Sequence, residues 1–526
     1  MRVLVTDNVN QEGVEVLKRE PGIEVEVRNK MTPEELLEII PGFDALIVRS
    51  ATKVTAEVID RAANLKVIGR AGVGVDNINV AHATEKGIIV VNAPEGNTIA
   101  ATEHTMALML ALARNVPQAD ARLKSGVWDK KAFVGVELRN KTLGILGLGR
   151  IGSGVAKRAQ AMEMDVLAYD PYITEERARE LGVRLGSLDD VLREADFITI
   201  HMPKTKETYH MLDERAFGLM KEGVRVINCA RGGIVDEDAL YKAVTSGKVA
   251  GAALDVFEVE PQTESPLLRL PNFIATPHLG ASTREAQVSV AVDVAEEIVS
   301  ALRGELVKNA VNIPALKPAE LQAVRPYLGL AERLGRFQAQ LVSGRIKAVS
   351  VTYNGELAAK PVTPLTTALV KGLLDSILQQ RVNYVNAMLV ARDRGIEITE
   401  TRSERAEDYA SLMTVKVTAS ESEHELAGTL FQGFDPRVVF IDGYRIDAVP
   451  RGHMLVIPHI DKPRIIGRVG TLIGAHDINI AAMQVGRKAV GGKAVMVLTI
   501  DSPVPPETLE EIAKVDGVLG VRQVSL

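Results

Sequence analysis

Cysteine and aromatic residues are scarce in this sequence of 526 residues. It contains one cysteine, Cys229, and only 4% aromatic residues. A single thiol excludes a disulfide within the chain and suits a reducing compartment, so we expect a cytoplasmic protein. With so few aromatic side chains, the cores must be built from valine, isoleucine, leucine and alanine. That composition is typical of parallel sheets flanked by helices.

Long apolar runs and excess positive charge are also missing. The most apolar run, residues 106–113, is far shorter than the roughly 18 residues that cross a membrane. The net charge of -6 lacks the basic character that nucleic-acid binding requires. The first residues, MRVLVTD, enter a strand pattern directly, so we expect no cleaved leader. We therefore expect no membrane or nucleic-acid partner, and small-molecule chemistry fits better.

The first half of the chain alternates strands with helices, which predicts two α/β units. Short β-branched runs define the first unit, at residues 3–5, 25–27, 45–48, 67–68 and 88–91. A long apolar helix is predicted over residues 98–114. A second strand series follows, at residues 143–146, 166–169, 197–200, 224–227, 251–254 and 273–275. This series is typical of a doubly wound sheet.

The second half has a different order. A helix over residues 283–302 is followed by Pro314 and Pro318, which predict a linker and a domain boundary near residue 315. Strands with fewer helices come next, at residues 348–353, 412–418 and 437–441. From His453 onward the pattern is strand, helix, strand, strand, helix, strand, a ferredoxin-like order. At about 150 residues per domain, the length predicts three or four domains.

A glycine-rich turn follows the strand at residues 143–146. It reads Gly147-Leu148-Gly149-Arg150-Ile151-Gly152 and leads into a helix rich in alanine and valine. In that context the glycines allow a tight turn, a close approach of the backbone to a pyrophosphate and close helix packing. Asp170 lies 18 residues after Gly152, where a carboxylate accepts hydrogen bonds from a ribose. We expect NAD rather than NADP, although Arg150 is a cation that could accommodate an extra phosphate.

Three later strands end in residues whose chemistry is complementary. Because the carboxyl ends of parallel strands converge on the ligand crevice, Arg231, Glu260 and His278 should meet there. Arg231 offers a planar fork for a carboxylate, His278 is a natural base, and Glu260 would stabilise its imidazolium. Taken singly, each also has an ordinary structural explanation. Cys229, beside Arg231, is better explained as a small buried residue than as a nucleophile.

The stretches GLGRIG, NCARGGIVDEDAL, ALDVFEVEP and PHLGAST resemble the signature set of the D-isomer-specific 2-hydroxyacid dehydrogenases. The resemblance implies the same roles for Arg231, Glu260 and His278, and it places Asp255 by the nicotinamide carboxamide. The NAD-binding residues that it implies are Gly147, Gly149, Arg150, Ile151, Gly152, Asp170, Cys229, Ala230, Asp255 and Gly280.

The same resemblance implies four domains. A Rossmann-type doubly wound dinucleotide domain (98–282) would be inserted in a flavodoxin-like substrate domain (1–97 and 283–315). An α+β intervening domain (316–451) and a ferredoxin-like ACT domain (452–526) would follow. The intervening segment shows no motif with a defensible mechanism.

Polar residues at predicted strand ends in the first unit suggest a substrate clamp. Arginine suits a phosphate, and adjacent backbone amides form a concavity for a carboxylate. The candidates are Arg49, Ser50, Arg70, Val73, Gly74 and Asn97, together with Arg231 and His278. Resemblance to the long members of the family implies 3-phosphoglycerate as the substrate, in the first step of the phosphorylated serine pathway. From the residues alone, a structural role for either Arg49 or Arg70 stays open.

The last segment resembles an ACT domain, which pairs with a second copy and holds an amino acid between the two. His459, Asp461 and Asn479 match the effector positions of the family, so L-serine is the expected effector and a homotetramer the expected assembly. Arg464 stands where the family has glycine, which argues against serine binding. An ACT domain kept only for assembly is the alternative.

Other functions are compatible with parts of this pattern. A glycerate, hydroxypyruvate or glyoxylate reductase would share Arg231, Glu260 and His278 but would need no phosphate clamp. An NAD-sensing scaffold would bind the cofactor without turnover. An amino-acid-responsive regulator would need a nucleic-acid-binding module, which the sequence does not show.

Overall fold

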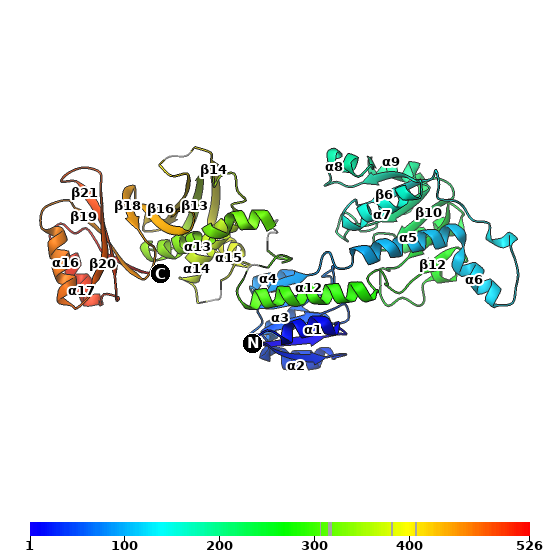
Figure 1. Ribbon diagram of the computed structural model, residues 1–526, viewed down its shortest axis with the longest axis horizontal. Helices are drawn as coiled ribbons and strands as arrows, with labels where there is room; N and C mark the ends of the chain where they lie inside the picture. The colour runs from blue at the N-terminus through cyan, green and yellow to red at the C-terminus, as the bar shows by residue number, and fades with distance from the viewer. Residues whose placement is uncertain (306, 314–317, 380–381, 406–407) are drawn as a thin grey trace.

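The described residues form four sheets, set out along the long axis of the molecule with the N-terminal sheet between the second and the third (Figure 1). The computed structural model describes residues 1–305, 307–313, 318–379, 382–405 and 408–526. The predicted boundary near residue 315, with Pro314, lies outside these residues. Pro318 does not belong to a linker as predicted, because it is the first residue of a helix, where its fixed φ and missing N–H are tolerated.

The first sheet is parallel and flavodoxin-like in strand order. The order is β2 (Glu24–Arg28), β1 (Arg2–Thr6), β3 (Ala45–Val48), β4 (Val67–Arg70) and β5 (Ile89–Asn92). The central strands are runs of buried aliphatic residues because helices cover both faces. One face packs against α1 (Gln11–Lys18) and α12 (Arg284–Leu302). The other packs against α2 (Pro33–Ile39), α3 (Ala56–Arg61) and α4 (Val80–Glu85). Helix α12 thus returns to the first sheet after the second is complete.

The second sheet is also parallel and has seven strands. The order is β12 (Phe273–Ala275), β11 (Val249–Leu254), β10 (Val224–Asn228), β9 (Phe197–Ile200), β6 (Thr142–Leu146), β7 (Asp165–Tyr169) and β8 (Arg184–Leu185). The strand order reverses between β6 and β9, which makes this the switch point of a doubly wound fold. The two-residue strand β8 was not predicted.

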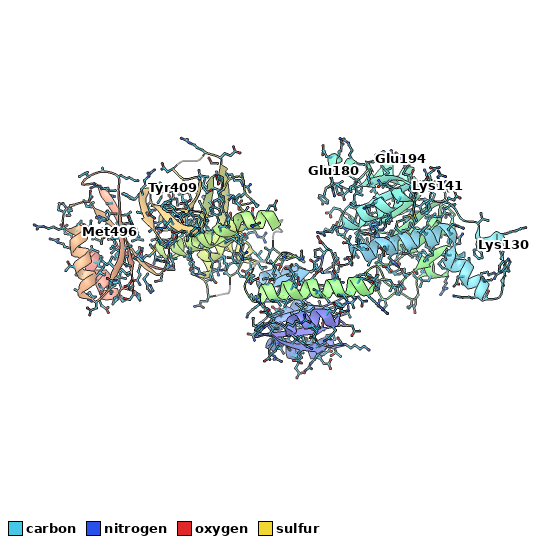
Figure 2. All side chains as sticks on the ribbon, in the orientation of Figure 1. Lys130, Lys141, Glu180, Glu194, Tyr409 and Met496 are labelled. Atoms are coloured by element: carbon cyan, nitrogen blue, oxygen red, sulfur yellow. The ribbon has the colours of Figure 1, made fainter. Side chains whose placement is uncertain are left out.

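Helices cover both faces of the second sheet. One face carries α5 (Thr98–Arg114), α7 (Arg150–Ala161) and α8 (Glu175–Glu180), and the bounds of α5 confirm the predicted helix. The other carries α9 (Leu188–Glu194), α10 (Glu214–Leu219) and α11 (Glu237–Thr245). After α5, an arm that begins with α6 (Val116–Lys124) extends away from the sheet, and Lys130 marks its outer part (Figure 2).

The third sheet is mixed and is covered on one face by three helices. The order is β14 (Glu397–Ser403), β13 (Ile346–Gly355), β15 (Ser411–Ala419), β16 (Glu423–Phe431), β17 (Asp435–Ile441) and β18 (Tyr444–Ala448). Only β13 and β14 pair in parallel. The helices are α13 (Pro318–Leu341), α14 (Thr363–Asp375) and α15 (Ala387–Asp393).

The fourth sheet is antiparallel and ferredoxin-like. The order is β20 (Ile480–Arg487), β21 (Lys493–Ile500), β19 (His453–Ile460) and β22 (Arg522–Ser525). One face packs against α16 (Ile465–Ala475) and α17 (Pro506–Ala513), with Met496 fully buried in that layer (Figure 2). Valines of the opposite face join the core of the third sheet. The predicted fold class is confirmed.

The described residues also include three short 3-10 turns: Ile40–Gly42, Lys131–Phe133 and Pro266–Arg269. Among the described helices, none combines the length and the apolar character needed to span a lipid bilayer.

Candidate active site

The glycine-rich turn joins β6 to α7 at the switch point of the second sheet. Gly147 has φ of 95°, and a Cβ there would lie 2.6 Å from the carbonyl oxygen of His201. A Cβ at Gly152 would lie 2.1 Å from the carbonyl oxygen of Gly147. At Gly149 the corresponding space is open, and no side chain of the described residues caps the amides at the start of α7. Uncapped amides beside open space fit the pyrophosphate of a dinucleotide.

Asp170 follows β7 and lies against the same turn. Its carboxylate accepts hydrogen bonds from the amides of Leu148, at 2.8 Å, and Tyr172, at 2.9 Å. Asp170 thus holds the glycine turn to the end of β7, a structural contact that the sequence did not reveal. Arg150 lies 3.8 Å from Glu95, and both side chains are exposed.

Asp255, at the end of β11, is fully buried and bonded to the loop that carries His278. One of its oxygens accepts hydrogen bonds from Thr276 Oγ1 at 2.5 Å and from the Leu279 amide at 2.7 Å. The other accepts one from the Gly280 amide at 2.8 Å. Burial acts to raise the pKa of Asp255, but hydrogen bonds from His104, Thr276 and Leu279 outweigh it and hold that pKa below its usual value. Asp255 is therefore a carboxylate that fixes this loop.

Cys229 and Ala230 follow β10 in the same corner of the site. Burial raises the pKa of the Cys229 thiol to about 12, so it stays neutral at pH 7. A neutral thiol at that position agrees with the interpretation of Cys229 as a small packed side chain and not a nucleophile.

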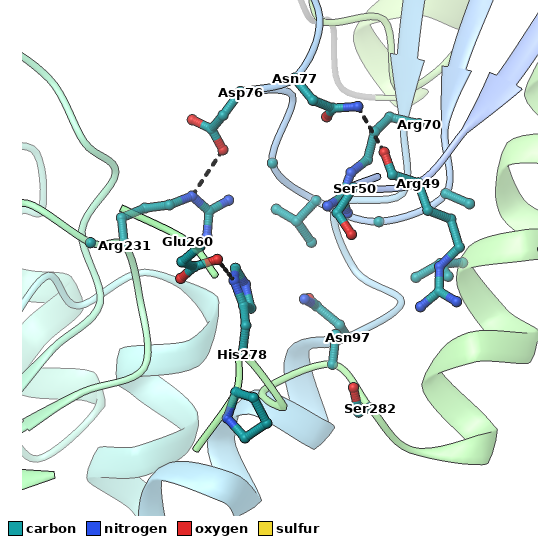
Figure 3. A pocket seen from close by; sticks show the side chains of 18 of the residues that line it. Arg49, Ser50, Arg70, Asp76, Asn77, Asn97, Arg231, Glu260, His278 and Ser282 are labelled. Atoms are coloured by element: carbon teal, nitrogen blue, oxygen red, sulfur yellow. Dashed lines mark hydrogen bonds and ion pairs between the residues drawn. The ribbon is translucent and has the colours of Figure 1, made fainter. Parts of the chain in front are cut away.

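His278 and Glu260 form a hydrogen-bonded pair, with 2.8 Å between His278 Nδ1 and Glu260 Oε2 (Figure 3). Glu260 also accepts a hydrogen bond from the Phe257 amide at 3.1 Å. The bond to Glu260 raises the pKa of His278 above its usual value, although burial works in the opposite direction. His278 has φ of 56°, an unusual backbone conformation for a side chain of this size. Its amide donates to the Asp255 carbonyl at 2.9 Å, which helps to hold that conformation.

Arg231 faces this pair from the end of β10. Its Nη1 donates to the Ala230 carbonyl at 2.7 Å, and its Nε donates to Asp76 Oδ2 at 3.1 Å. Asp76 belongs to the loop after β4 in the first sheet, so this ion pair joins the two sheets across the pocket (Figure 3).

One pocket brings the predicted substrate residues together between the first and second sheets. It is lined by Arg49, Ser50, Arg70, Val73, Gly74 and Asn97 on one side, and by Arg231, Glu260 and His278 on the other. Residues that the sequence analysis missed also line it: Asp76, Asn77, Lys204, Glu258, Ser282 and Gln287. Lys204 follows the end of β9, so the rule that identified Arg231 would have identified it too.

Two polar side-chain atoms in this pocket are buried without a partner in the part of the chain that the structure describes. Arg70 Nε and Asn97 Oδ1 find no hydrogen-bond partner among the residues described by the structure. Burial lowers the pKa of Arg70 to about 10, and the positive charges of Arg231 and Arg49 contribute to that shift. Three guanidinium groups close enough to repel one another are suited to a ligand with more than one negative charge.

The residues predicted to bind an effector are divided between two ends of the fourth sheet. His459 is buried and pairs with Ala494 across β19 and β21, and Asp461 lies just beyond, 3.1 Å from Arg487 Nη1. Asn479 lies at the other end, where its amide donates to Asp501 at 2.9 Å. One chain therefore does not bring all three residues to one place.

Arg464 caps the start of α16 with φ of 75°. This left-handed conformation favours glycine, which gives a physical reason for the glycine in the family pattern. Arginine at this position departs from that pattern.

Family models match three segments of the chain. The model of the D-isomer specific 2-hydroxyacid dehydrogenase NAD binding domain matches residues 106–280. The D-3-phosphoglycerate dehydrogenase intervening domain and the ACT domain match residues 323–442 and 453–517.

Whole-chain comparisons agree with these matches. D-3-phosphoglycerate dehydrogenase of Archaeoglobus fulgidus is 50% identical over 529 residues, covering 100% of both chains. That of Synechocystis sp. is 48% identical over 526 residues, covering 100% of this chain and 95% of the relative. The crystal structure of D-lactate dehydrogenase from Aquifex aeolicus, complexed with NAD and lactic acid, superimposes with a TM-score of 0.54 and 33% identity. That match covers 60% of this chain and 100% of the other.

Fold, pocket and matches together define an NAD-dependent dehydrogenase. The chain belongs to the D-isomer specific 2-hydroxyacid dehydrogenase family, and within it to the D-3-phosphoglycerate dehydrogenases, which it matches over its full length.

Proposed function

We propose that this protein oxidises D-3-phosphoglycerate to 3-phosphohydroxypyruvate with NAD, the first step of the phosphorylated L-serine pathway. The observation that carries the proposal is a pocket with a histidine–carboxylate pair at one side and, at the other, arginines that include Arg70, whose Nε has no partner among the described residues. The substrate has a carboxylate, a hydroxyl group and a phosphate. Each of these groups has a chemical counterpart in the pocket.

The catalytic chemistry rests on Arg231, His278 and Glu260. Arg231 binds the substrate carboxylate together with the amides of Val73 and Gly74. Glu260 holds His278 Nδ1, so Nε2 is the atom left to take the proton from the C2 hydroxyl. NAD, when bound, supplies the acceptor for the hydride that leaves C2. The carboxylate of Glu260 then stabilises the imidazolium that forms.

The remaining substrate residues serve the phosphate. Arg49 and Arg70 provide cationic donors, and Ser50 and Asn97 provide polar groups beside them. In the cofactor site we assign NAD contacts to the glycine turn, and Asp170 excludes the 2′-phosphate of NADP through charge repulsion.

Absorbance of NADH at 340 nm tests this function with a panel of 2-hydroxy and 2-oxo acids, with and without a 3-phosphate. We expect turnover with 3-phosphoglycerate and NAD, and little with NADP. Equal efficiency with glycerate, hydroxypyruvate or glyoxylate would favour the reductase alternative. No turnover with any acid would favour the alternative of an NAD-sensing scaffold that binds the cofactor without catalysis.

The pH dependence should report the His278–Glu260 pair. Oxidation needs the neutral imidazole, so kcat/KM for oxidation should fall as pH drops through a His278 pKa that lies above its usual value. Glu260→Gln removes the charge that raises this pKa, so the acid limb should move to lower pH. In the direction of reduction, which needs the imidazolium, the rate at neutral pH should fall. Rate profiles from pH 5 to 10 in both directions measure this, and an unaltered limb would exclude Glu260 as the partner.

We also propose that the C-terminal domain (452–526) binds L-serine between two copies and that the chain assembles as a cytoplasmic homotetramer. We propose residues 1–97 with 283–315 as the substrate domain, 98–282 as the NAD-binding domain and 316–451 as the intervening domain. The strand register supports a shared effector site, because His459 and Asp461 of one copy would need Asn479 from a second. Arg464 adds bulk and charge near the start of α16 and opposes serine binding.

A serine titration of the initial rate tests the effector site. Coupling between such sites is typically about 1 to 3 kcal/mol, so activity or affinity should change by roughly 5- to 150-fold. Asn479→Ala should lose this response and keep basal turnover. An equal response in both proteins, or none up to millimolar serine, would contradict the site. Sedimentation of the whole chain reports the assembly independently.

A further inference from the structure

Asp76 reaches across the pocket to Arg231 from the opposite side. Arg231 belongs to the second sheet and Asp76 to the first, and their side chains meet at 3.1 Å (Figure 3). The Asp76 side chain is 70% exposed. Ion pairs as exposed as this contribute little to stability, so a role in folding does not explain why the contact is built.

The backbone around Asp76 is shaped to admit this contact. A Cβ at Gly74 would lie 2.0 Å from Arg231 Nη2 and 2.8 Å from Asp76 Oδ2, so a larger residue would displace the pair. The loop itself is anchored. Asn77 Nδ2 donates to the Arg49 and Thr52 carbonyls at 2.8 and 2.6 Å, and Asn92 Nδ2 donates to the Val73 carbonyl at 2.5 Å. The carboxylate of Asp76 is thus presented by a fixed loop.

The contact determines which edge of Arg231 faces the substrate. Nε donates a hydrogen bond to Asp76, and Nη1 donates one to the Ala230 carbonyl. Nη2 lies against Gly74, since a Cβ there would be 2.0 Å from it. Arg231, Val73 and Gly74 all line the same pocket.

Asp76 also moderates the positive charge of the pocket. Arg49 and Arg231 both act to lower the pKa of Arg70, whereas Asp76 acts to raise it. Removing this carboxylate therefore has two separable consequences. Arg231 loses its orientation, and the pocket becomes more attractive to anions.

We propose that Asp76 is a positioning residue that orients Arg231 across the pocket for binding the substrate carboxylate. The inference rests on the proposed function, because it takes Arg231 as the group that binds that carboxylate. Asp76 does not touch the reacting atoms and acts only through the guanidinium group.

Two substitutions separate orientation from charge. Asp76→Ala removes the acceptor for Nε, and because small misplacements of a positioning group cost up to about 100-fold, we expect kcat to fall by roughly 10- to 100-fold. Asp76→Asn keeps an oxygen for Nε but removes the charge, so we expect kcat within about 3-fold of the unmodified protein. In Asp76→Asn, KM for the anionic substrate should be unchanged or lower, because the pocket has lost a negative charge. Asp60→Asn is the matched control, since it removes the charge of an exposed aspartate of α3, which pairs with Lys86 at 2.6 Å outside the pocket.

Oxalate binding, measured by calorimetry, gives a readout that does not need turnover. Asp76→Ala should bind this dicarboxylate more weakly than the unmodified protein, and Asp76→Asn should bind it at least as well. If Asp76→Asn is as impaired as Asp76→Ala, or if neither changes kcat or oxalate affinity, the inference is wrong. If the unmodified protein turns over no 2-hydroxy acid but the oxalate affinities follow the expected order, the proposed function fails and the role of Asp76 stands. Melting temperatures of all variants should agree, because the pair is exposed.

Discussion

Replacing His278 with alanine should lower kcat by about 10² to 10⁴, the usual contribution of a positioned general acid or base. The affinity for NAD should stay almost unchanged. The loop that carries His278 is held by backbone bonds to Asp255 and not by the imidazole, so the loop should keep its place. Steady-state kinetics and calorimetric titration with NAD measure the two quantities separately.

Two further variants make this result specific. His278→Asn should be as inactive as His278→Ala, because asparagine tolerates the positive φ of 56° but cannot act as a base at neutral pH. His210→Ala is the matched control. His210 also has positive φ, at 50°, and a carboxylate partner at 2.8 Å, Glu258, but it does not line the pocket. A kcat within tenfold of the unmodified protein for His278→Ala, or an equal loss for His210→Ala, would contradict the assignment.

Much of this site could be predicted from the sequence because parallel sheets obey a strong geometric rule. The carboxyl ends of their strands meet at one edge, so the strand pattern alone was enough to place the residues after β10, β11 and β12 side by side. The glycine turn could also be predicted, because its glycine spacing is specific for a dinucleotide site when a strand precedes it and a helix follows it. Sequence pattern alone did not identify the insertion of one α/β unit into another, which rested on family resemblance.

Contacts between distant segments were beyond that reasoning. Asp76 lies 155 residues from Arg231, and its exposure and charge give no hint of a partner. The loop-holding contacts of Asp255 were hidden for the same reason, because they depend on side-chain directions at the end of a buried strand. The separation of Asn479 from His459 follows from strand direction. Both β19 and β20 pair antiparallel with β21, so a residue just before β20 and a residue near the end of β19 lie at opposite ends of the sheet.

Arg70 is where sequence left a choice between a structural and a substrate-binding role, and Arg70→Ala should decide it. The guanidinium is held against Gly72, where a Cβ would lie 1.4 Å from Nη1. Its Nε has no partner among the described residues, and burial beside two other cations lowers its pKa to about 10, so it is still charged at pH 7. A partly buried cation whose Nε donates no hydrogen bond is costly in the free protein, and it becomes favourable when a phosphate arrives.

Arg70→Ala should therefore raise KM for 3-phosphoglycerate by about 30-fold or more, since losing one member of a buried charge pair costs about 2 to 5 kcal/mol. KM for non-phosphorylated glycerate should change little, because the phosphate is the group that Arg70 serves. Arg70→Lys keeps the charge without the planar fork, so its KM for 3-phosphoglycerate should lie between those of the unmodified protein and Arg70→Ala. The melting temperature of Arg70→Ala should be unchanged or higher, because the substitution removes a partly buried charge whose Nε has no partner among the described residues. A lower melting temperature with KM unchanged would instead assign Arg70 a structural role, and an equal rise in KM for both substrates would show that it does not recognise the phosphate.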